Sequence, residues 1–218
     1  MKVLIACESS GTVREAFRAL GHEAWSADLL PADDGSPYHL QGDVLQVLAN
    51  GWDLMVAHPP CTYLSVSGMH WTTRGLRDPK LTEDALEFAR ALMDAPIPRI
   101  AIENPVSIIS SRIRKPDQII QPWQFGDDAS KKTCLWLKNL PKLNNEDRSK
   151  WILGRIVGED KRGMTIMRWA NQCDSGQNKL APSTDRWKQR SKTYNGIAQA
   201  MAQTWGNETR LETSGLLF

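Results

Sequence analysis

The sequence predicts an open, mostly parallel α/β sheet with helices on both faces. Short apolar runs rich in β-branched residues alternate with segments of helical periodicity over the first 105 residues. Several of these runs stop abruptly at polar residues or prolines, as buried strands do where they leave a sheet. In such sheets ligands bind at the carboxyl ends of the strands, so the residues that follow each run are the candidate functional residues.

The order of these segments gives the expected elements. Strands are expected at residues 2–7, 23–27, 53–57, 99–103 and 133–137, and helices at 13–20, 82–94 and 197–205. Residues 144–192 are polar and turn-rich with weak periodicity, which is typical of a small irregular region, and residues 206–218 are expected to fray. We therefore divide the chain into a catalytic domain (1–143), a small basic recognition region (144–190) and a C-terminal helix that returns to the catalytic domain, with its tail (191–218).

Composition excludes several classes of protein. The 218 residues are 41% hydrophobic and 24% charged, as in ordinary globular domains. No apolar run approaches the length of a membrane span or of a signal peptide, so we expect a cytoplasmic protein without a membrane partner, and a monomer by default. The four cysteines contain no CxxC pair and do not combine with histidines at zinc-ligand spacing, so reduced thiols and no metal are expected.

The charge is unevenly distributed along the chain. Residues 1–143 carry a net charge of −2, whereas residues 144–192 carry +5 together with three of the nine tryptophans. A basic segment that contains tryptophans is typical of a nucleic-acid contact surface, although a solvated charged face over buried tryptophans has the same pattern. The candidate DNA-binding residues are Arg155, Lys161, Arg162, Arg168, Arg186, Lys188 and Arg190.

Two features near the N-terminus are typical of nucleoside-cofactor sites. The turn after the first strand consists of small and polar residues, Cys7-Glu8-Ser9-Ser10-Gly11, and leads into a helix. Asp28 ends the second strand, where an acidic side chain can bind ribose hydroxyls. An ordinary strand–helix turn beside a solvated aspartate has the same sequence, so these features indicate a cofactor site only in combination with reactive groups at other strand ends.

The next two strand ends carry reactive groups. Cys61 follows His58-Pro59-Pro60, whose prolines fix the backbone and hold the thiol at the edge of the sheet. Glu103 ends the following strand, where partial desolvation is expected to raise its pKa and suit it to act on a ring nitrogen. A thiol nucleophile and a carboxyl group on neighbouring strand ends are the groups that conjugate addition to a pyrimidine requires.

Together these residues resemble the DNA (cytosine-5)-methyltransferase family, in particular the short forms of phages and prophages. The segments that carry the resemblance are Ala6–Gly11 (methionine-binding loop), Asp28 (ribose), Gly42-Asp43-Val44 (adenine), Asp53–Ser65 (Pro-Cys nucleophile loop), Glu103-Asn104-Pro105 (Glu-Asn-Val motif) and Tyr194–Ala198 (Gly-Asn turn and helix). The first loop has fewer glycines than the family pattern, Pro105 replaces valine, and Lys131-Lys132 is the nearest equivalent of a missing Arg-x-Arg strand.

The resemblance implies a Rossmann-like methyltransferase fold, S-adenosylmethionine as cofactor and DNA, in duplex form, as partner. It implies that Cys61 adds to C6 of a flipped cytosine while Glu103 stabilises charge at N3. The residues implied in cofactor binding are Cys7, Glu8, Ser9, Ser10, Gly11, Asp28, Asp43, Pro59, Asn195 and Ile197.

Three alternatives stay open at this point. The gaps in the family pattern are compatible with a non-catalytic DNA-binding protein on a decayed methyltransferase fold. The short recognition region is compatible with an RNA or single-stranded substrate. His58-Pro59-Pro60-Cys61 also partly resembles the Asp-Pro-Pro-Tyr of enzymes that methylate exocyclic amines.

Overall fold

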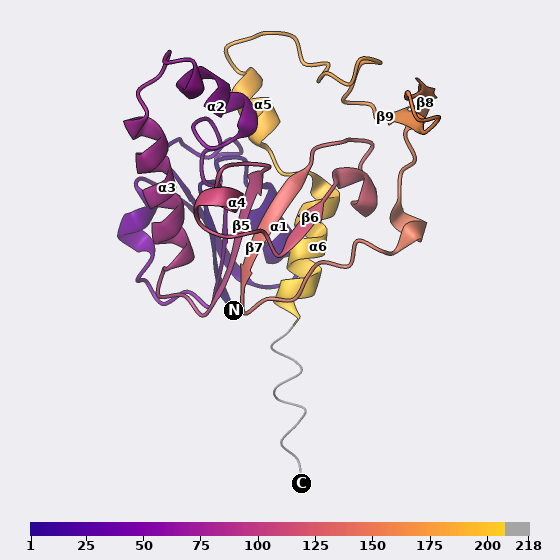
Figure 1. Cartoon of the computed structure of the whole chain (residues 1–218). Helices are drawn as coiled ribbons and strands as arrows, with labels where there is room; N and C mark the ends of the chain where they lie inside the picture. Colours follow the sequence, from indigo (N-terminus) through magenta and orange to yellow (C-terminus); the bar gives the residue numbers. More distant parts are fainter. Residues whose placement is uncertain (208–218) are drawn as a thin grey trace.

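A seven-stranded sheet forms the centre of the computed structural model, which describes residues 1–207 (Figure 1). The strand order is β3-β2-β1-β4-β5-β7-β6, in which β1 to β5 are parallel and β7 runs antiparallel to both of its neighbours. The strands are β1 (Lys2–Ala6), β2 (Glu23–Asp28), β3 (His39–Gln41), β4 (Leu54–Ala57), β5 (Arg99–Pro105), β6 (Gln118–Ile120) and β7 (Thr133–Lys138). The predicted Rossmann-like, mostly parallel α/β fold is confirmed.

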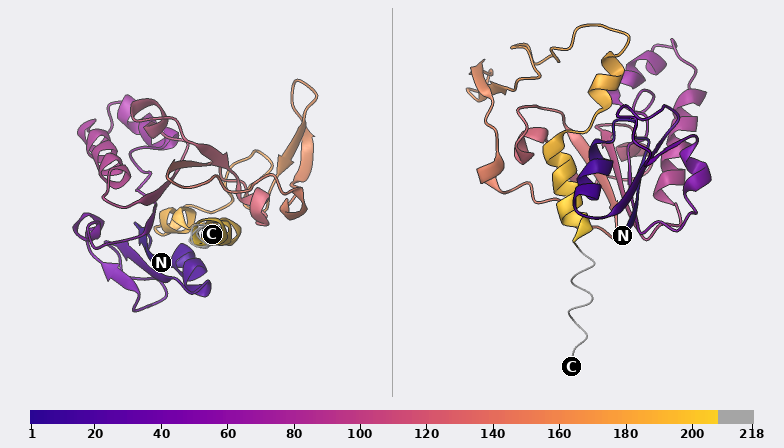
Figure 2. Two further views of the ribbon diagram at one scale, coloured as in Figure 1. Left: turned by 90° about the horizontal axis from the view of Figure 1, so that it is seen from below. Right: turned by 180° about the vertical axis from the view of Figure 1, so that it is seen from behind.

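Alternate residues of the central strands pack into two separate cores. On one face Leu4, Met55 and Ile100 pack with the apolar side of α3 (Lys80–Met93). On the other face Val3 and Val56 pack with α1 (Thr12–Ala19) and α6 (Asn195–Gly206). Seen from below, the sheet separates these helix layers (Figure 2). Since both faces are covered, residues 3–6 of β1 and all of β4 are apolar and buried, as parallel strands usually are.

Several elements lie outside the expected pattern. They are the short edge strands β3 and β6, the helices α2 (Val66–Thr73), α4 (Ile109–Arg112) and α5 (Arg186–Ser191), the 3-10 turns Val44–Val47, Pro122–Phe125 and Arg148–Lys150, and the hairpin β8 (Arg155–Glu159) and β9 (Thr165–Arg168). Their apolar periodicity is too short or too weak to be recognised in sequence. The expected tail lies mostly outside the described residues.

The basic region forms an arm beside the sheet. Its hairpin, β8 with β9, pairs only with itself and stands apart from the sheet in two views (Figures 1 and 2). Three indoles connect the base of this arm to the body: the ring of Trp123 stacks on that of Trp169 at a centroid distance of 5.5 Å and meets that of Trp151 edge-on at 5.0 Å. The tryptophans Trp151 and Trp169 thus serve packing between the arm and the body.

Helix α6 depends on a glycine at its first turn. Gly196 donates its backbone N–H to Asp127 Oδ2 over 2.9 Å, and a Cβ at this position would overlap the carbonyl oxygen of Phe125. A methyl group in this contact must displace backbone. We expect Gly196→Ala to lower the free energy of unfolding by about 1–3 kcal/mol. Urea denaturation measures this loss, and Gln203→Ala on the exposed side of the same helix should leave stability within about 0.5 kcal/mol.

Candidate functional site

A cavity of about 1090 Å³ opens at the carboxyl ends of the parallel strands. It lies where the strand order reverses direction, between β1 and β4, which is where open α/β sheets bind ligands. Ten of the residues selected from the sequence line this one cavity: Cys7, Glu8, Ser9, Ser10, Asp28, Pro59, Cys61, Glu103, Lys188 and Arg190. The fold therefore gathers most of the predicted site.

The loop after β1 is shaped by its contacts with α1. Cys7 adopts a left-handed backbone conformation (φ 59°) while its N–H donates to Ala27 O over 2.7 Å. The buried carboxylate of Glu8 accepts the backbone N–H groups of Val13 (2.8 Å) and Arg14 (3.2 Å), so it satisfies the start of the helix. Gly11 is also left-handed, and a Cβ there would overlap the Arg14 guanidinium. Glu8 thus fixes the loop after β1 to the first turn of α1.

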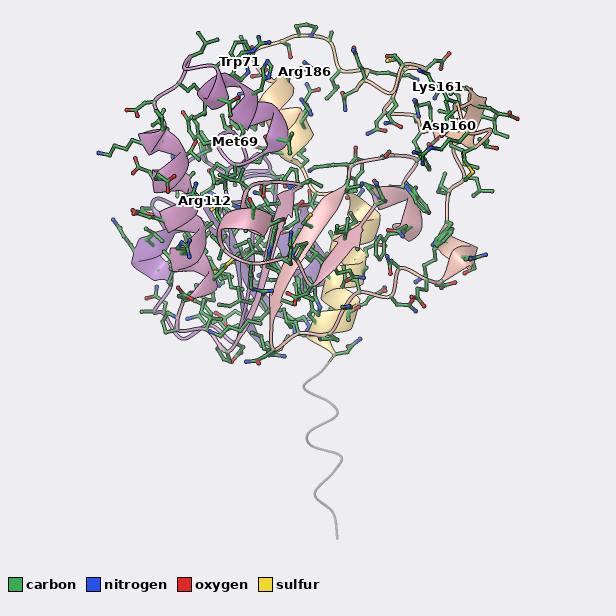
Figure 3. The ribbon with its side chains drawn as sticks, viewed as in Figure 1. Met69, Trp71, Arg112, Asp160, Lys161 and Arg186 are labelled. Carbon is green, nitrogen blue, oxygen red and sulfur yellow. The ribbon has the colours of Figure 1, made fainter. Side chains whose placement is uncertain are left out.

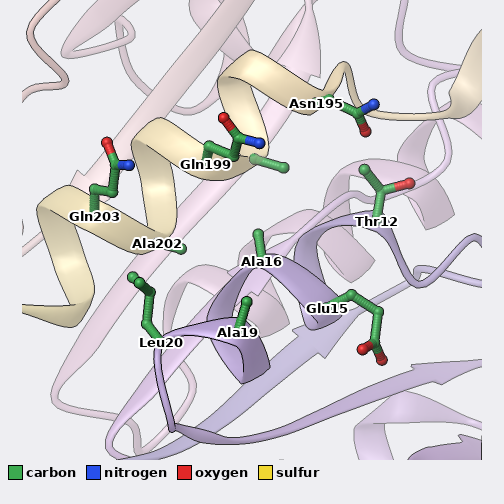
Figure 4. Close-up of a pocket in the computed structure, with 10 residues that line it drawn as sticks. Thr12, Glu15, Ala16, Ala19, Leu20, Asn195, Gln199, Ala202 and Gln203 are labelled. Atoms are coloured by element: carbon green, nitrogen blue, oxygen red, sulfur yellow. The ribbon is translucent and has the colours of Figure 1, made fainter.

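Four of the predicted cofactor residues do not line the main cavity. Gly11 belongs to the loop after β1 but is not part of the cavity lining. Asp43 is exposed and accepts the N–H of Leu45 as the N-cap of a 3-10 turn. Ile197 lies on the buried side of α6 and packs in the core. Asn195 lies in a second hollow of about 580 Å³ between α1 and α6, opposite Thr12 (Figure 4). This second hollow, lined with alanines and glutamines, contains none of the reactive groups.

The Cys61 loop is fixed by its neighbours. Asn104, at the end of β5, donates from Nδ2 to Pro59 O over 2.7 Å inside the protein. The carbonyl of Cys61 accepts the N–H groups of Leu64 (3.1 Å) and Ser65 (2.9 Å), and α2 begins directly afterwards. The cysteine itself is half-buried. These bonds place the thiol at the cavity wall without a disulfide.

His58 and Glu103 form a buried pair in the wall of the cavity. Ala57 of β4 is paired with Ile102 of β5, so the residues that follow them, His58 and Glu103, lie side by side. The Nδ1 of His58 and the Oε2 of Glu103 are 3.0 Å apart, and the two side chains are only 10% and 8% exposed. His58 Nε2 is buried and has no hydrogen-bond partner among the described residues.

The charge state of Glu103 differs from the expectation. Burial raises the pKa of its carboxyl, but the Lys131 ammonium, the His58 hydrogen bond and the Thr133 hydroxyl together hold the pKa below its ordinary value. The predicted raised pKa is therefore wrong, because sequence did not reveal these partners. Glu103 is an ionised acceptor at neutral pH, so Nδ1 of His58 donates the hydrogen bond.

The thiol of Cys61 stays protonated at neutral pH. Burial raises its pKa, and the negative charge of Glu103 adds to this effect, while Lys131 opposes both. The neighbouring thiol of Cys7 has its pKa shifted in the same direction by burial and by Asp28 and Asp43. Either cysteine needs a proton acceptor before it can act as a nucleophile.

Sequence reasoning gave His58 no role and made Lys131 only a stand-in for a missing arginine. The sequence marks His58 as the first residue after a buried strand. The register of β4 and β5 then places it beside Glu103. Lys131 belongs to the loop that precedes β7, whose antiparallel pairing with β5 sets Thr133 opposite Pro105. Both Lys131 and Lys132 line the cavity.

The predicted DNA-binding residues fall into separate groups. Lys188 and Arg190 of α5 line the cavity, and Lys188 also pairs with Asp33 over 2.6 Å. Lys161 and Arg162 are exposed at the turn of the hairpin. In Figure 3, Lys161 lies far from Arg186 of α5. The side chains of Arg155 and Arg168 are engaged within the arm, where Asp174 accepts hydrogen bonds from both. The guanidinium Nε of Arg186 is buried and has no hydrogen-bond partner among the described residues.

Neither a metal nor a membrane is indicated in the part of the chain that the structure describes. No group of three or more potential ligand side chains is placed to hold a metal ion within residues 1–207. Among the same residues, no helix is long and apolar enough to cross a bilayer.

Comparisons with known proteins yield only distant likenesses. No model of a protein family matches the sequence, and no curated protein sequence matches it. Among solved structures, a DNA modification methyltransferase encoded within an E. coli prophage is similar with a TM-score of 0.42 and 14% identity, over 63% of this chain and 46% of that one. The Entamoeba histolytica methyltransferase EhMeth is similar with a TM-score of 0.47 and 17% identity, over 64% and 53%. This chain thus matches about half the length of each, and its function must be argued from the site.

The ionised state of Glu103 has a consequence for stability. A carboxyl whose pKa is depressed by folding stabilises the protein at pH values above its unfolded value, 4.5, and the stabilisation is lost as pH falls through the folded pKa. We expect Glu103→Gln to lower the free energy of unfolding at pH 7 and to have a smaller effect at pH 3. Urea titrations of both proteins at the two pH values measure this difference. An equal effect at both values would contradict an ionised Glu103.

Proposed function

We propose that this protein is an S-adenosylmethionine-dependent methyltransferase that methylates C5 of cytosine in DNA. One observation carries the proposal: the Cys61 thiol and the Glu103 carboxylate, from neighbouring strand ends, share a cavity with the β1 loop and Asp28. A nucleophile, a charged group for the ring nitrogen and a place for a nucleoside are thereby adjacent. A non-catalytic DNA-binding protein on a decayed fold would not need this combination of groups.

The residues around β1 and β2 fit the nucleoside part of the cofactor. The left-handed Cys7 turns the backbone of the loop, which lines the cavity through Ser9 and Ser10, and Asp28 offers a carboxylate at the end of β2. Pro59 lines the same cavity. We assign the loop, Asp28 and Pro59 to cofactor binding. Asp43, Asn195 and Ile197 do not line this cavity, and the proposal gives them no contact with the cofactor. The cofactor supplies an electrophilic methyl group.

The chain's own residues perform the rest of the proposed reaction. Cys61 Sγ forms a bond to C6 of the ring, and the ring electrons move toward C5, which then takes the methyl group. The ring takes a proton from water at N3 during this addition, and the Glu103 carboxylate accepts a hydrogen bond from that N3–H. Water then takes the C5 proton, Cys61 departs as the C5–C6 double bond forms again, and the N3 proton returns to water. Tight fixation of the Cys61 loop by Asn104 serves to align the thiol with C6.

Cations near the cavity suit a polyanionic partner. Lys131, Lys132, Lys188 and Arg190 line it, and Lys161 and Arg162 are exposed on the arm. We propose that these side chains contact phosphates, while Arg155 and Arg168 shape the arm that presents them. Phosphate contacts of this kind give an affinity that falls with salt, by a log–log slope of about −0.9 for each phosphate neutralised.

Methylation of an exocyclic amine is the second candidate. An ionised Glu103 beside His58 provides the hydrogen-bond acceptor that such chemistry needs for the amine, which the sequence pattern alone did not offer. This reaction requires no covalent bond to the protein. A covalent trap therefore separates the two candidates.

The trap uses duplex DNA that contains 5-fluorocytosine in many sequence contexts, incubated with the protein and S-adenosylmethionine. Fluorine at C5 cannot leave as a proton does, so the Cys61–C6 bond should persist. We expect an adduct that resists denaturant on gels and disappears in Cys61→Ala but not in Cys173→Ser. Methylation without an adduct would instead support the amine as target.

Cofactor binding can be tested without a nucleic acid. We expect Asp28→Ala to weaken binding of S-adenosylhomocysteine by about 10- to 100-fold, since a hydrogen bond to a charged group contributes about 1.5–3 kcal/mol. Asp43→Ala, which removes an exposed carboxylate outside the cavity, should change affinity by less than about threefold. Isothermal titration calorimetry measures both. Equal effects of the two substitutions would contradict the assignment of the ribose site to Asp28.

A further inference from the structure

The pairing of His58 with Glu103 leaves one imidazole nitrogen free beside a nucleophile that needs a base. Glu103 is an ionised acceptor, so the Nδ1 of His58 carries the proton of their 3.0 Å hydrogen bond. In a neutral imidazole, Nε2 then has a free lone pair. This nitrogen is buried and has no partner among the described residues, and such a group is costly unless something uses it.

Cys61 is the candidate proton donor to this lone pair. His58 and Cys61 are the two ends of the tetrapeptide His58-Pro59-Pro60-Cys61, and both line the cavity together with Glu103. The prolines limit the conformations of this segment, and the Asn104–Pro59 bond fixes its middle. The thiol is protonated at neutral pH, because burial and the Glu103 charge both disfavour its anion.

We infer that Cys61, His58 and Glu103 form a nucleophile–base–carboxylate triad in which His58 Nε2 accepts the thiol proton of Cys61. This inference rests on the proposed function only for the identity of the electrophile. It requires the Cys61 side chain to turn toward Nε2 when an electrophile reaches the thiol, a contact that commonly tightens only in the reacting complex. Histidine thus becomes a further catalytic residue of the site.

The proton balance of the step is closed. The Sγ–H bond breaks, the proton moves to Nε2, and the sulfur electron pair forms the bond to the electrophilic carbon. The resulting imidazolium is stabilised by the adjacent Glu103 carboxylate, which itself stays ionised. When the sulfur–carbon bond breaks at the end of the reaction, the thiolate takes its proton back from Nε2.

The charged and titratable groups near His58 and Cys61 come from three parts of the fold. Glu103 faces Nδ1 from β5, Cys61 is on the same loop, and Lys131 approaches Glu103 and Cys61 from the loop before β7. Glu103 therefore has two opposite effects on the thiol. Its charge directly disfavours the thiolate, whereas its hydrogen bond keeps the proton of His58 on Nδ1 and leaves Nε2 free to accept the thiol proton.

Alkylation of Cys61 by iodoacetamide at pH 7, followed by peptide mass spectrometry, separates these effects without any methyl transfer. In His58→Asn the amide Nδ2 can replace Nδ1 as donor to Glu103, while Nε2 is lost. We expect this variant to alkylate at least about tenfold more slowly at Cys61. We also expect Glu103→Gln to slow alkylation, although removal of a like charge alone would accelerate it.

Cys173 serves as an internal reference in the same samples, because it does not line the cavity and the Ser175 hydroxyl lowers its pKa. Its rate should be the same in all proteins, and circular dichroism confirms that each variant is folded. An unchanged Cys61 rate in His58→Asn, or an unchanged or faster rate in Glu103→Gln, would overturn the triad. Failure of the fluorocytosine trap with these rates as expected would overturn only the proposed function.

Discussion

The site depends on the parallel register between β4 and β5. Because Ala57, the last residue of β4, is paired with Ile102 of β5, the residues that follow them, His58 and Glu103, lie side by side. Both strands are buried on both faces, so this register is strongly determined by the packing of the two cores. His58 and Glu103 are thus positioned by backbone hydrogen bonding of the sheet, whereas Cys61 is positioned by its loop.

Glu103 and Cys61 are both buried in this cavity, but their neighbours give them opposite charge states. Glu103 has a lysine, a histidine and a threonine within reach, and these overcome the cost of desolvation. Cys61 has a lysine on one side and the carboxylate on the other, so desolvation prevails and its proton is retained. One cavity therefore keeps a carboxylate charged and a thiol neutral. A thiol that keeps its proton needs a base before it can act as a nucleophile, and the proposed triad assigns that role to His58.

Much of this could be predicted from sequence, for a physical reason. The central strands and the helices α1, α3 and α6 bury long apolar stripes, whose spacing is visible in the residues themselves. Cys61 and Glu103 were found because proline and polar residues mark the ends of buried strands. The charge of Glu103 could not be predicted, because Lys131 approaches it from a distant loop. The placement of Asn195 and Ile197 also depends on how α6 rotates against the sheet, which a short motif does not determine.

The way the arm is attached determines which of its residues can be replaced without loss of stability. Its hairpin pairs only with itself, and the contacts that hold it are gathered at its base, in the indoles of Trp123, Trp151 and Trp169 and in the hydrogen bonds between Asn171 and Ser130. Residues at its turn, such as Lys161, contribute nothing to the two cores. The outer residues of the arm can therefore change without loss of stability in the two cores.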